Sequence, residues 1–85
     1  MSDSQRLIAL EEALLDAHAQ KDQIALVGLY SEAGDIKERG GAIDAACFYY
    51  THAYVFALET GDVRQHMLLG KLVQYGRDAY ATNDV

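Results

Sequence analysis

Three histidines are the side chains of this sequence best suited to bind a metal ion: His18, His52 and His66. A metal site on a helix needs ligands three or four residues apart, so that they share one face, and no two of these histidines have that spacing. The chain also contains neither a Cys-x-x-Cys nor a His-Glu-x-x-His motif. The sequence therefore predicts no metal site, and it gives no sign of a cofactor.

Cys47 and a group of carboxylates are the remaining candidates for catalysis. Cys47 lies in an apolar stretch with no basic residue nearby in the sequence to lower its pKa, which favours a buried core residue over a nucleophile. Glu11, Glu12 and Asp16 resemble an acid–base set, but their helical spacing places them on a solvated face where no apolar neighbour raises a carboxylate pKa. We therefore predict no catalytic residue and no enzymatic activity.

The composition indicates a small folded protein that binds neither nucleic acid nor membrane. The chain has 85 residues, 51% of them hydrophobic, and a formal net charge of −6. Its seven basic residues are dispersed, whereas phosphate binding and anionic membrane surfaces require basic clusters. A single cysteine allows no intrachain disulfide, and the first residues lack the basic stretch of a secretory signal. We expect one domain over residues 1–85, located in the cytoplasm.

Helical periodicity and the absence of proline favour an all-α fold. Ser2 and Gln5 have the spacing of a capping box, Asp22 is a favourable cap for a second helix, and Gly40–Gly41 ends that helix. The predicted fold is a four-helix antiparallel array with helices at about residues 3–19, 22–39, 42–59 and 62–79.

The third and fourth helices carry the strongest predictions about the core. The third is apolar around most of its circumference, which is typical of a central helix packed on more than one side. Asp62 is expected to cap the fourth helix. The inner residues predicted for that helix are Val63, Met67, Leu69, Gly70, Leu72, Val73 and Gly76.

An internal similarity appears when the chain is aligned with itself at a shift of 40 residues. Leu14 then aligns with Tyr54, Ala17 with Ala57, and the cap Asp22 with Asp62. The order of apolar, small and capping positions is kept better than the residue identities. Such a register is typical of two-helix units that stack and bury one another's faces.

The sequence also resembles the tetratricopeptide-repeat family. Leu26–Tyr30, followed by Ala33–Asp35, is similar to the Leu-Gly-x-x-Tyr and Gly-Asp pattern in the first helix of that repeat. Ala46, Tyr50 and Ala53 have the small–aromatic–small spacing of its second helix. The resemblance covers roughly residues 22–60 and implies stacked helical hairpins that bind other proteins.

Two sets of residues are candidates for an interaction surface. A second apolar row on the first and third helices contains Ile8, Leu15, Phe48 and Val55, which are either partly buried under neighbouring helices or form an outward patch. The family resemblance implies that the second and fourth helices line a ligand groove. Polar contacts there would come from Gln23, Lys71, Gln74 and Tyr75.

The functional prediction is a protein-interaction adapter or a small assembly subunit with a protein partner that the sequence does not name. The alternative is a self-associating structural domain, a homodimer that uses the apolar row as an isologous interface. A small enzyme or metal protein is the third reading, and it lacks a convergent set of polar residues.

Overall fold

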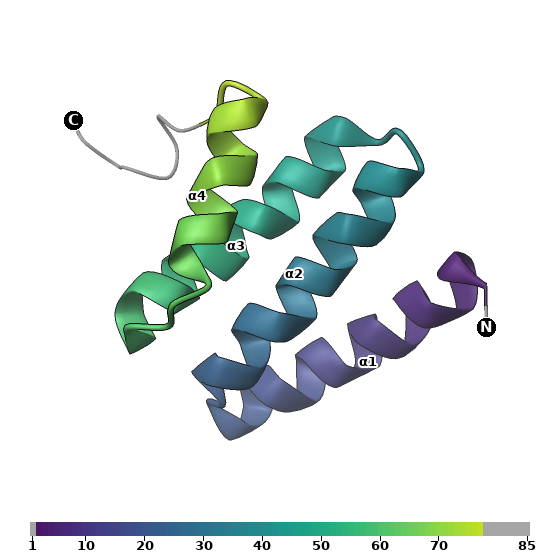
Figure 1. Cartoon of the computed structure of the whole chain (residues 1–85). Coiled ribbons are helices and arrows are strands. Elements are labelled where there is room, and N and C mark those ends of the chain that lie inside the picture. Colours follow the sequence, from purple (N-terminus) through teal and green to yellow (C-terminus); the bar gives the residue numbers. More distant parts are fainter. Residues whose placement is uncertain (1, 78–85) are drawn as a thin grey trace.

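Four helices joined by short turns make up the described part of the chain. The computed structural model describes residues 2–77, and its helices are α1 (Asp3–Gln20), α2 (Gln23–Arg39), α3 (Ile43–Thr60) and α4 (Gln65–Gln74). Consecutive helices run in opposite directions, so α1 and α3 point the same way (Figure 1). Residues 2–77 contain no strand. The prediction of an all-α, four-helix antiparallel array is confirmed.

The first two helices begin at the residues whose side chains cap them. The Ser2 hydroxyl accepts a hydrogen bond from the Gln5 backbone N–H at 3.2 Å, and Gln5 Oε1 accepts one from the Ser2 N–H at 3.3 Å. Asp22 Oδ1 accepts a hydrogen bond from the Ala25 N–H at 3.1 Å. Such bonds satisfy donors of the first turn that have no partner inside the helix. The observed ends of α1, α2 and α3 all lie within one residue of the predicted ends.

Glycine makes the turns after α2 and α3 possible. Gly41 has a φ of 82° and Gly61 a φ of 69°, in the left-handed region that other residues rarely adopt. The chain reverses at both places, which allows α3 to pack back on α2 and α4 to pack back on α3. The predicted helix end at Gly40–Gly41 is confirmed.

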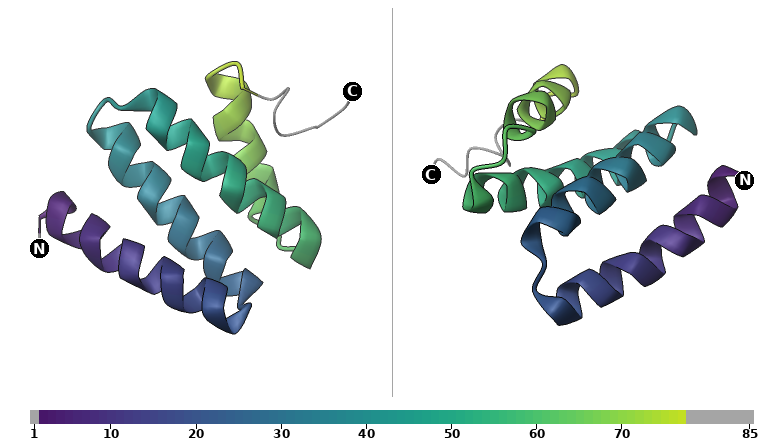
Figure 2. Two further views of the ribbon diagram at one scale, coloured as in Figure 1. Left: turned by 180° about the vertical axis from the view of Figure 1, so that it is seen from behind. Right: turned by 60° about the horizontal axis from the view of Figure 1, so that its bottom comes forward.

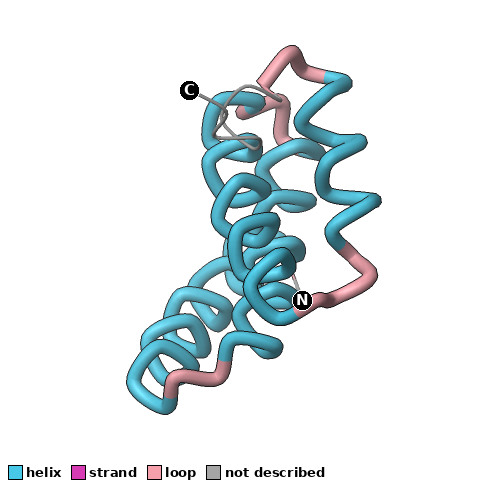
Figure 3. The backbone as a smooth tube through the Cα atoms, turned by 90° about the vertical axis from the view of Figure 1, so that its left-hand side faces the viewer, coloured by secondary structure: helices cyan, strands magenta, loops and turns pink. Residues whose placement is uncertain are grey.

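The α2–α3 pair forms the centre of the molecule, with α1 on one side and α4 on the other (Figure 2). The segments that join the helices are short (Figure 3). On the α1 side, Leu10 packs with Ala33 and Ile36 of α2. On the α4 side, Leu68 and Leu72 join the main core cluster of α2 and α3. Since α3 is packed on more than one side, its prediction as a central helix is confirmed.

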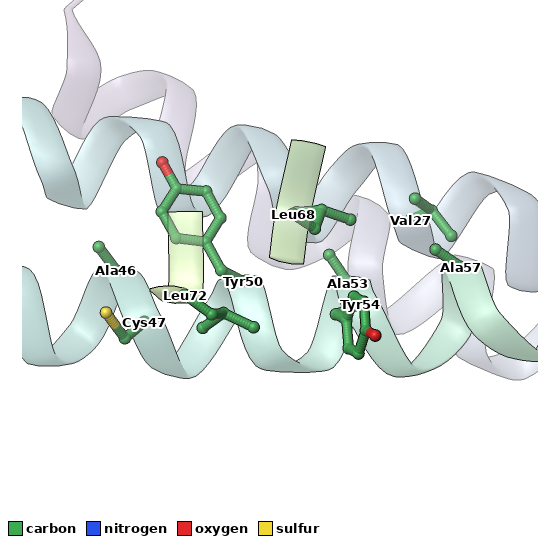
Figure 4. Packing of buried hydrophobic residues seen from close by; sticks show 9 residues of the cluster. All are labelled: Val27, Ala46, Cys47, Tyr50, Ala53, Tyr54, Ala57, Leu68 and Leu72. Atoms are coloured by element: carbon green, nitrogen blue, oxygen red, sulfur yellow. The ribbon is translucent and has the colours of Figure 1, made fainter. Parts of the chain in front are cut away.

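The main core cluster combines small side chains of α3 with larger ones from the neighbouring helices. Alanines of α3 let α2 approach closely, and the Tyr50 ring reaches from α3 toward α2 (Figure 4). Tyr50 is fully buried, as are Leu68 and Leu72. The complete cluster consists of Val27, Ala46, Cys47, Tyr50, Ala53, Tyr54, Ala57, Leu68 and Leu72.

The prediction for the fourth helix was wrong at its start. The helix begins at Gln65 rather than at residue 62, and no side chain caps its first turn. Asp62 instead accepts hydrogen bonds from the backbone N–H and the guanidinium of Arg64, which holds residues 62–64 in a turn. The helix ends at Gln74, and positions 78 and 79 of the predicted helix lie outside the described residues.

The predicted inner face of the fourth helix was also largely wrong. Val63, Met67 and Val73 are exposed by 79%, 47% and 55%, and Leu68, which the prediction left out, is completely buried. The prediction was right for Leu72, which is also completely buried. The sequence carries two apolar stripes with helical spacing here, and both satisfy the same periodicity. Which of the two stripes is buried depends on how α4 packs against the α2–α3 core, and periodicity alone does not give that orientation.

Candidate interaction surface

Four large apolar side chains stand out from α1 and α3. Ile8 and Leu15 of α1 are exposed by 60% and 74%, and Phe48 and Val55 of α3 by 59% and 41%. We call these four residues and the surface between them the α1/α3 face. Exposure of a single apolar residue is ordinary, whereas several large ones exposed on two helices make this face the candidate interaction surface.

Helix geometry explains why these residues point away from the core. In α1 the buried residues Leu10, Leu14 and Ala17 form one stripe, and Ile8 and Leu15 lie on the nearly opposite side of the helix. Ile8 and Leu15 are seven positions apart, close to two helical turns, so they project in the same direction about 10 Å apart. Phe48 and Val55 have the same spacing on α3, which runs parallel to α1.

Aromatic and histidine rings fill the space between α1 and α3 below this face. The His18 ring of α1 meets the edge of the Phe56 ring of α3 with centroids 5.9 Å apart, and His18 Nε2 is 2.9 Å from the Tyr30 hydroxyl. His52 packs on Tyr30 at 5.1 Å and on Phe48 at 4.5 Å. These ring contacts give the side chain of Phe48 a supported position on the surface. The sequence did not predict this cluster.

A hollow of about 400 Å³ lies beside Phe48 on the outer side of α3. Its lining includes an ion pair between Asp44 and Arg77, with an N–O distance of 2.6 Å. Cys47 lines the hollow but is buried, and that burial raises the pKa of its thiol, as expected of a core residue rather than a nucleophile. The residues around the hollow are Asp44, Cys47, Phe48, Thr51, His52 and Arg77.

The predicted groove residues on α2 and α4 take part mainly in contacts within the chain. Lys71 Nζ donates to Glu38 Oε1 at 2.7 Å, and the Tyr75 hydroxyl donates to the other oxygen of the same carboxylate. Gln23 donates to Glu59 of α3 at 3.0 Å, and Gln74 is exposed. The structure therefore brings Lys71 and Tyr75 together, whereas Gln23 lies at the far end of α2.

Glu38 is the centre of a polar cluster that sequence reasoning missed. Besides Lys71 and Tyr75, it accepts a hydrogen bond from the Tyr50 hydroxyl at 3.0 Å, and the same hydroxyl lies 2.6 Å from Asp35 Oδ1. The hydrogen bonds from Lys71 and Tyr75 lower the pKa of Glu38, so its carboxylate is charged at neutral pH. Asp35 and Glu38 share a face of α2, but only the fold brings the three partners to them.

The cluster is suited to fastening helices rather than to acid–base chemistry. Burial, and then hydrogen bonding to Asp35 and Glu38, raise the pKa of Tyr50, so the hydroxyl keeps its proton and serves as a donor. Each oxygen of the Glu38 carboxylate is already engaged by a neighbour. The cluster ties α3 and α4 to α2 at one end of the molecule.

Two structural features of residues 2–77 concern metal binding and membrane insertion. Within these residues no three side chains of His, Cys, Asp or Glu are grouped so that they could hold a metal ion. Nor does this stretch contain a helix with the length and apolar character that crossing a bilayer requires.

Comparison with known proteins gives no match: no family model, no curated protein and no solved structure matches this chain. The assignment of a function therefore depends on the surface itself.

Proposed function

We propose that this protein is a non-enzymatic interaction module, an adapter or small assembly subunit that works in the cytoplasm and binds a partner protein through the α1/α3 face. The observation that carries the proposal is the exposure of Ile8, Leu15, Phe48 and Val55 on two parallel helices. An 85-residue chain has a small core, so burial of further apolar surface against a partner would also stabilise its fold.

Phe48 is the strongest candidate for the central contact. Aromatic side chains contribute much of the binding energy in protein interfaces, and the loss of a central one typically costs about 2 kcal/mol or more. Phe48 is exposed by 59%, it is supported underneath by His52 and Tyr49, and it stands next to the hollow on α3. It combines accessible apolar area with a fixed orientation, which lowers the entropy cost of binding.

The test is a comparison of three forms of the full chain immobilised for capture from a lysate of the native host. Phe48→Asp places a charge in the face, and Val73→Asp places the same charge on α4 at a similar exposure of 55%. Partner proteins should bind the wild type and the Val73 variant but not the Phe48 variant. Unchanged circular dichroism and thermal midpoints would show that both variants are folded.

Two results would contradict the proposal. If Phe48→Asp captures the same proteins as the wild type, the α1/α3 face is not the binding surface. If light scattering shows that the wild type is a dimer and Phe48→Asp a monomer, the face serves self-association, the alternative predicted from the sequence.

A further inference from the structure

Beside the α1/α3 face the charged side chains of α1 and α3 are mostly acidic, and Arg77 borders the face from beyond α4. From Leu7 to its end α1 contains no lysine or arginine, and the whole of α3 contains none either. The same stretches carry five acidic residues, which are Glu11, Glu12, Asp16, Asp44 and Glu59. The face therefore joins apolar side chains to negative charge, and Arg6, the basic residue of α1, is paired with Glu32 of α2.

Most of the basic side chains form ion pairs with carboxylates. Five of the seven basic residues form ion pairs: Arg6 with Glu32, Arg39 with Asp3, Arg64 with Asp62, Lys71 with Glu38, and Arg77 with Asp44. Only the last pair borders the α1/α3 face, and there the Asp44 side chain remains 93% exposed. The negative charge of Glu11 and Glu12 on α1 is thus left to solvent or to a partner.

The acidic residues lie between the apolar ones, at helical spacing. Ile8, Glu11, Glu12 and Leu15 occupy positions i, i+3, i+4 and i+7 of α1, which form a single stripe on the helix surface. All four residues are exposed. The parallel stripe on α3 has Phe48 and Val55 at its ends with His52 between them. A complementary partner needs apolar groups about two helical turns apart and cations between or beside them.

We propose that the α1/α3 face binds a basic amphipathic helix of a partner protein, a segment with one apolar stripe flanked by lysine or arginine. This inference rests on the proposed function and names the chemistry of the partner. A helix presents apolar side chains at the same seven-residue interval as the two stripes of the face. Its flanking cations would neutralise Glu11 and Glu12, and the complementary charge would accelerate encounter.

A second copy of this chain fits the face less well. A two-fold contact through α1 and α3 would bring Glu11 and Glu12 of one chain toward the same acidic surface of the other. Like charges that approach in a partly dry interface are unfavourable, and the net charge of −6 adds repulsion over a longer range. The basic helix removes both penalties.

Three labelled peptides of 18 residues test the inference by fluorescence anisotropy with the full chain. The three peptides share leucines at the spacing i, i+3, i+4 and i+7, repeated along the sequence. They differ at the remaining positions, which are all lysine, all glutamine or all glutamate. We expect the lysine peptide to bind at least tenfold more tightly than the glutamine peptide, and the glutamate peptide not to bind. Raising NaCl from 50 to 300 mM should weaken the lysine complex severalfold.

Variants locate the binding site on the protein. Phe48→Ser should weaken the lysine peptide at least tenfold, and the double change Glu11→Gln and Glu12→Gln should weaken it about three- to tenfold. Val73→Ser, a substitution at similar exposure on α4, should change binding less than twofold. All variants keep the core unchanged, and their thermal midpoints should remain close to that of the wild type.

Each other outcome is decisive. If the lysine peptide fails to bind, or binds Phe48→Ser as well as the wild type, the inference is overturned. If the glutamine peptide binds the wild type as tightly as the lysine peptide does, and Phe48→Ser abolishes this binding, the face is a docking site but its partner is not a basic helix. A wild-type dimer that Phe48→Ser dissociates would identify a second copy as the occupant. Capture from the host lysate tests the proposed function separately from all these peptide results.

Discussion

Replacing Gly34 with alanine should destabilise the protein, although alanine is the better helix former. Gly34 lies inside α2 and faces the Tyr50 ring. A Cβ atom built there would lie 2.5 Å from Tyr50 Cε1 and 2.7 Å from Cδ1, closer than carbon atoms approach in proteins. The ring has little room to move, because it is fully buried and its hydroxyl is bonded to Asp35 and Glu38.

The magnitude follows from three contributions. Alanine in place of glycine gains about 1 kcal/mol of helix propensity. Overpacking of a close-packed core costs about 1–3 kcal/mol, and a displaced Tyr50 hydroxyl weakens a hydrogen bond to a charged group by about 1 kcal/mol or more. The net loss is about 1–3 kcal/mol, which lowers the melting temperature of a domain this size by about 5–20 °C.

Gly70→Ala is the matched control, since it makes the same substitution inside α4 with no atom within 4 Å of the added Cβ. There only the helix propensity changes, so stability should rise by about 0.5–1 kcal/mol. Thermal and urea unfolding followed by circular dichroism at 222 nm measure both variants. In a Tyr50→Leu background the cost of Gly34→Ala should shrink by at least about 1 kcal/mol, because the ring that it strikes is gone.

A Gly34→Ala protein as stable as the wild type would refute the close packing of Tyr50 on α2. A change of the same sign in the free energy of unfolding for Gly34→Ala and Gly70→Ala would refute it as well. Either result would also leave the glycine in the middle of α2 without a packing reason.

Three further predictions concern the core and the polar cluster. Leu72→Ala should cost about 2–5 kcal/mol in urea unfolding, because the Leu72 side chain is completely buried where α4 packs on the α2–α3 core; a loss below about 1 kcal/mol would show that α4 is not firmly docked. Tyr50→Phe should cost about 1–2 kcal/mol through loss of its hydroxyl bonds, with an unchanged circular dichroism spectrum. Glu38→Gln should lower the melting temperature at pH 7. The hydrogen bonds from Lys71 and Tyr75 lower the Glu38 pKa in the folded state, so its stabilising effect exists above the ordinary carboxyl pKa and is lost as pH falls. The difference from the wild type should therefore narrow between about pH 5 and pH 3; a constant difference over that range would contradict the assignment.

The first three helices could be predicted because their signals are local. Ser2 with Gln5, Asp22 and the glycines at 40 and 41 act on neighbouring backbone groups, and the structure contains each of these features. The apolar circumference of the third segment likewise indicated a central helix. The tetratricopeptide-like resemblance stays a prediction, since it concerns membership of a family rather than the presence of helices.

The candidate face was only half predictable. The seven-residue spacing of Ile8 with Leu15, and of Phe48 with Val55, is visible in the sequence, but their exposure was not decided by it. The sequence was equally compatible with partial burial of both pairs under neighbouring helices. The structure leaves them accessible because the inner stripes of α1 and α3 are the ones that contact α2.

The sequence by itself determined where most helices begin and end, because capping and turn formation involve residues a few positions apart. Tertiary structure alone decided which stripe of α4 is buried and which partners surround Glu38. Both depend on side chains more than ten positions apart, such as Glu38 with Tyr50, Lys71 and Tyr75. Helical periodicity indicates which residues share a stripe, but only the packing of one helix on another determines which stripe is buried.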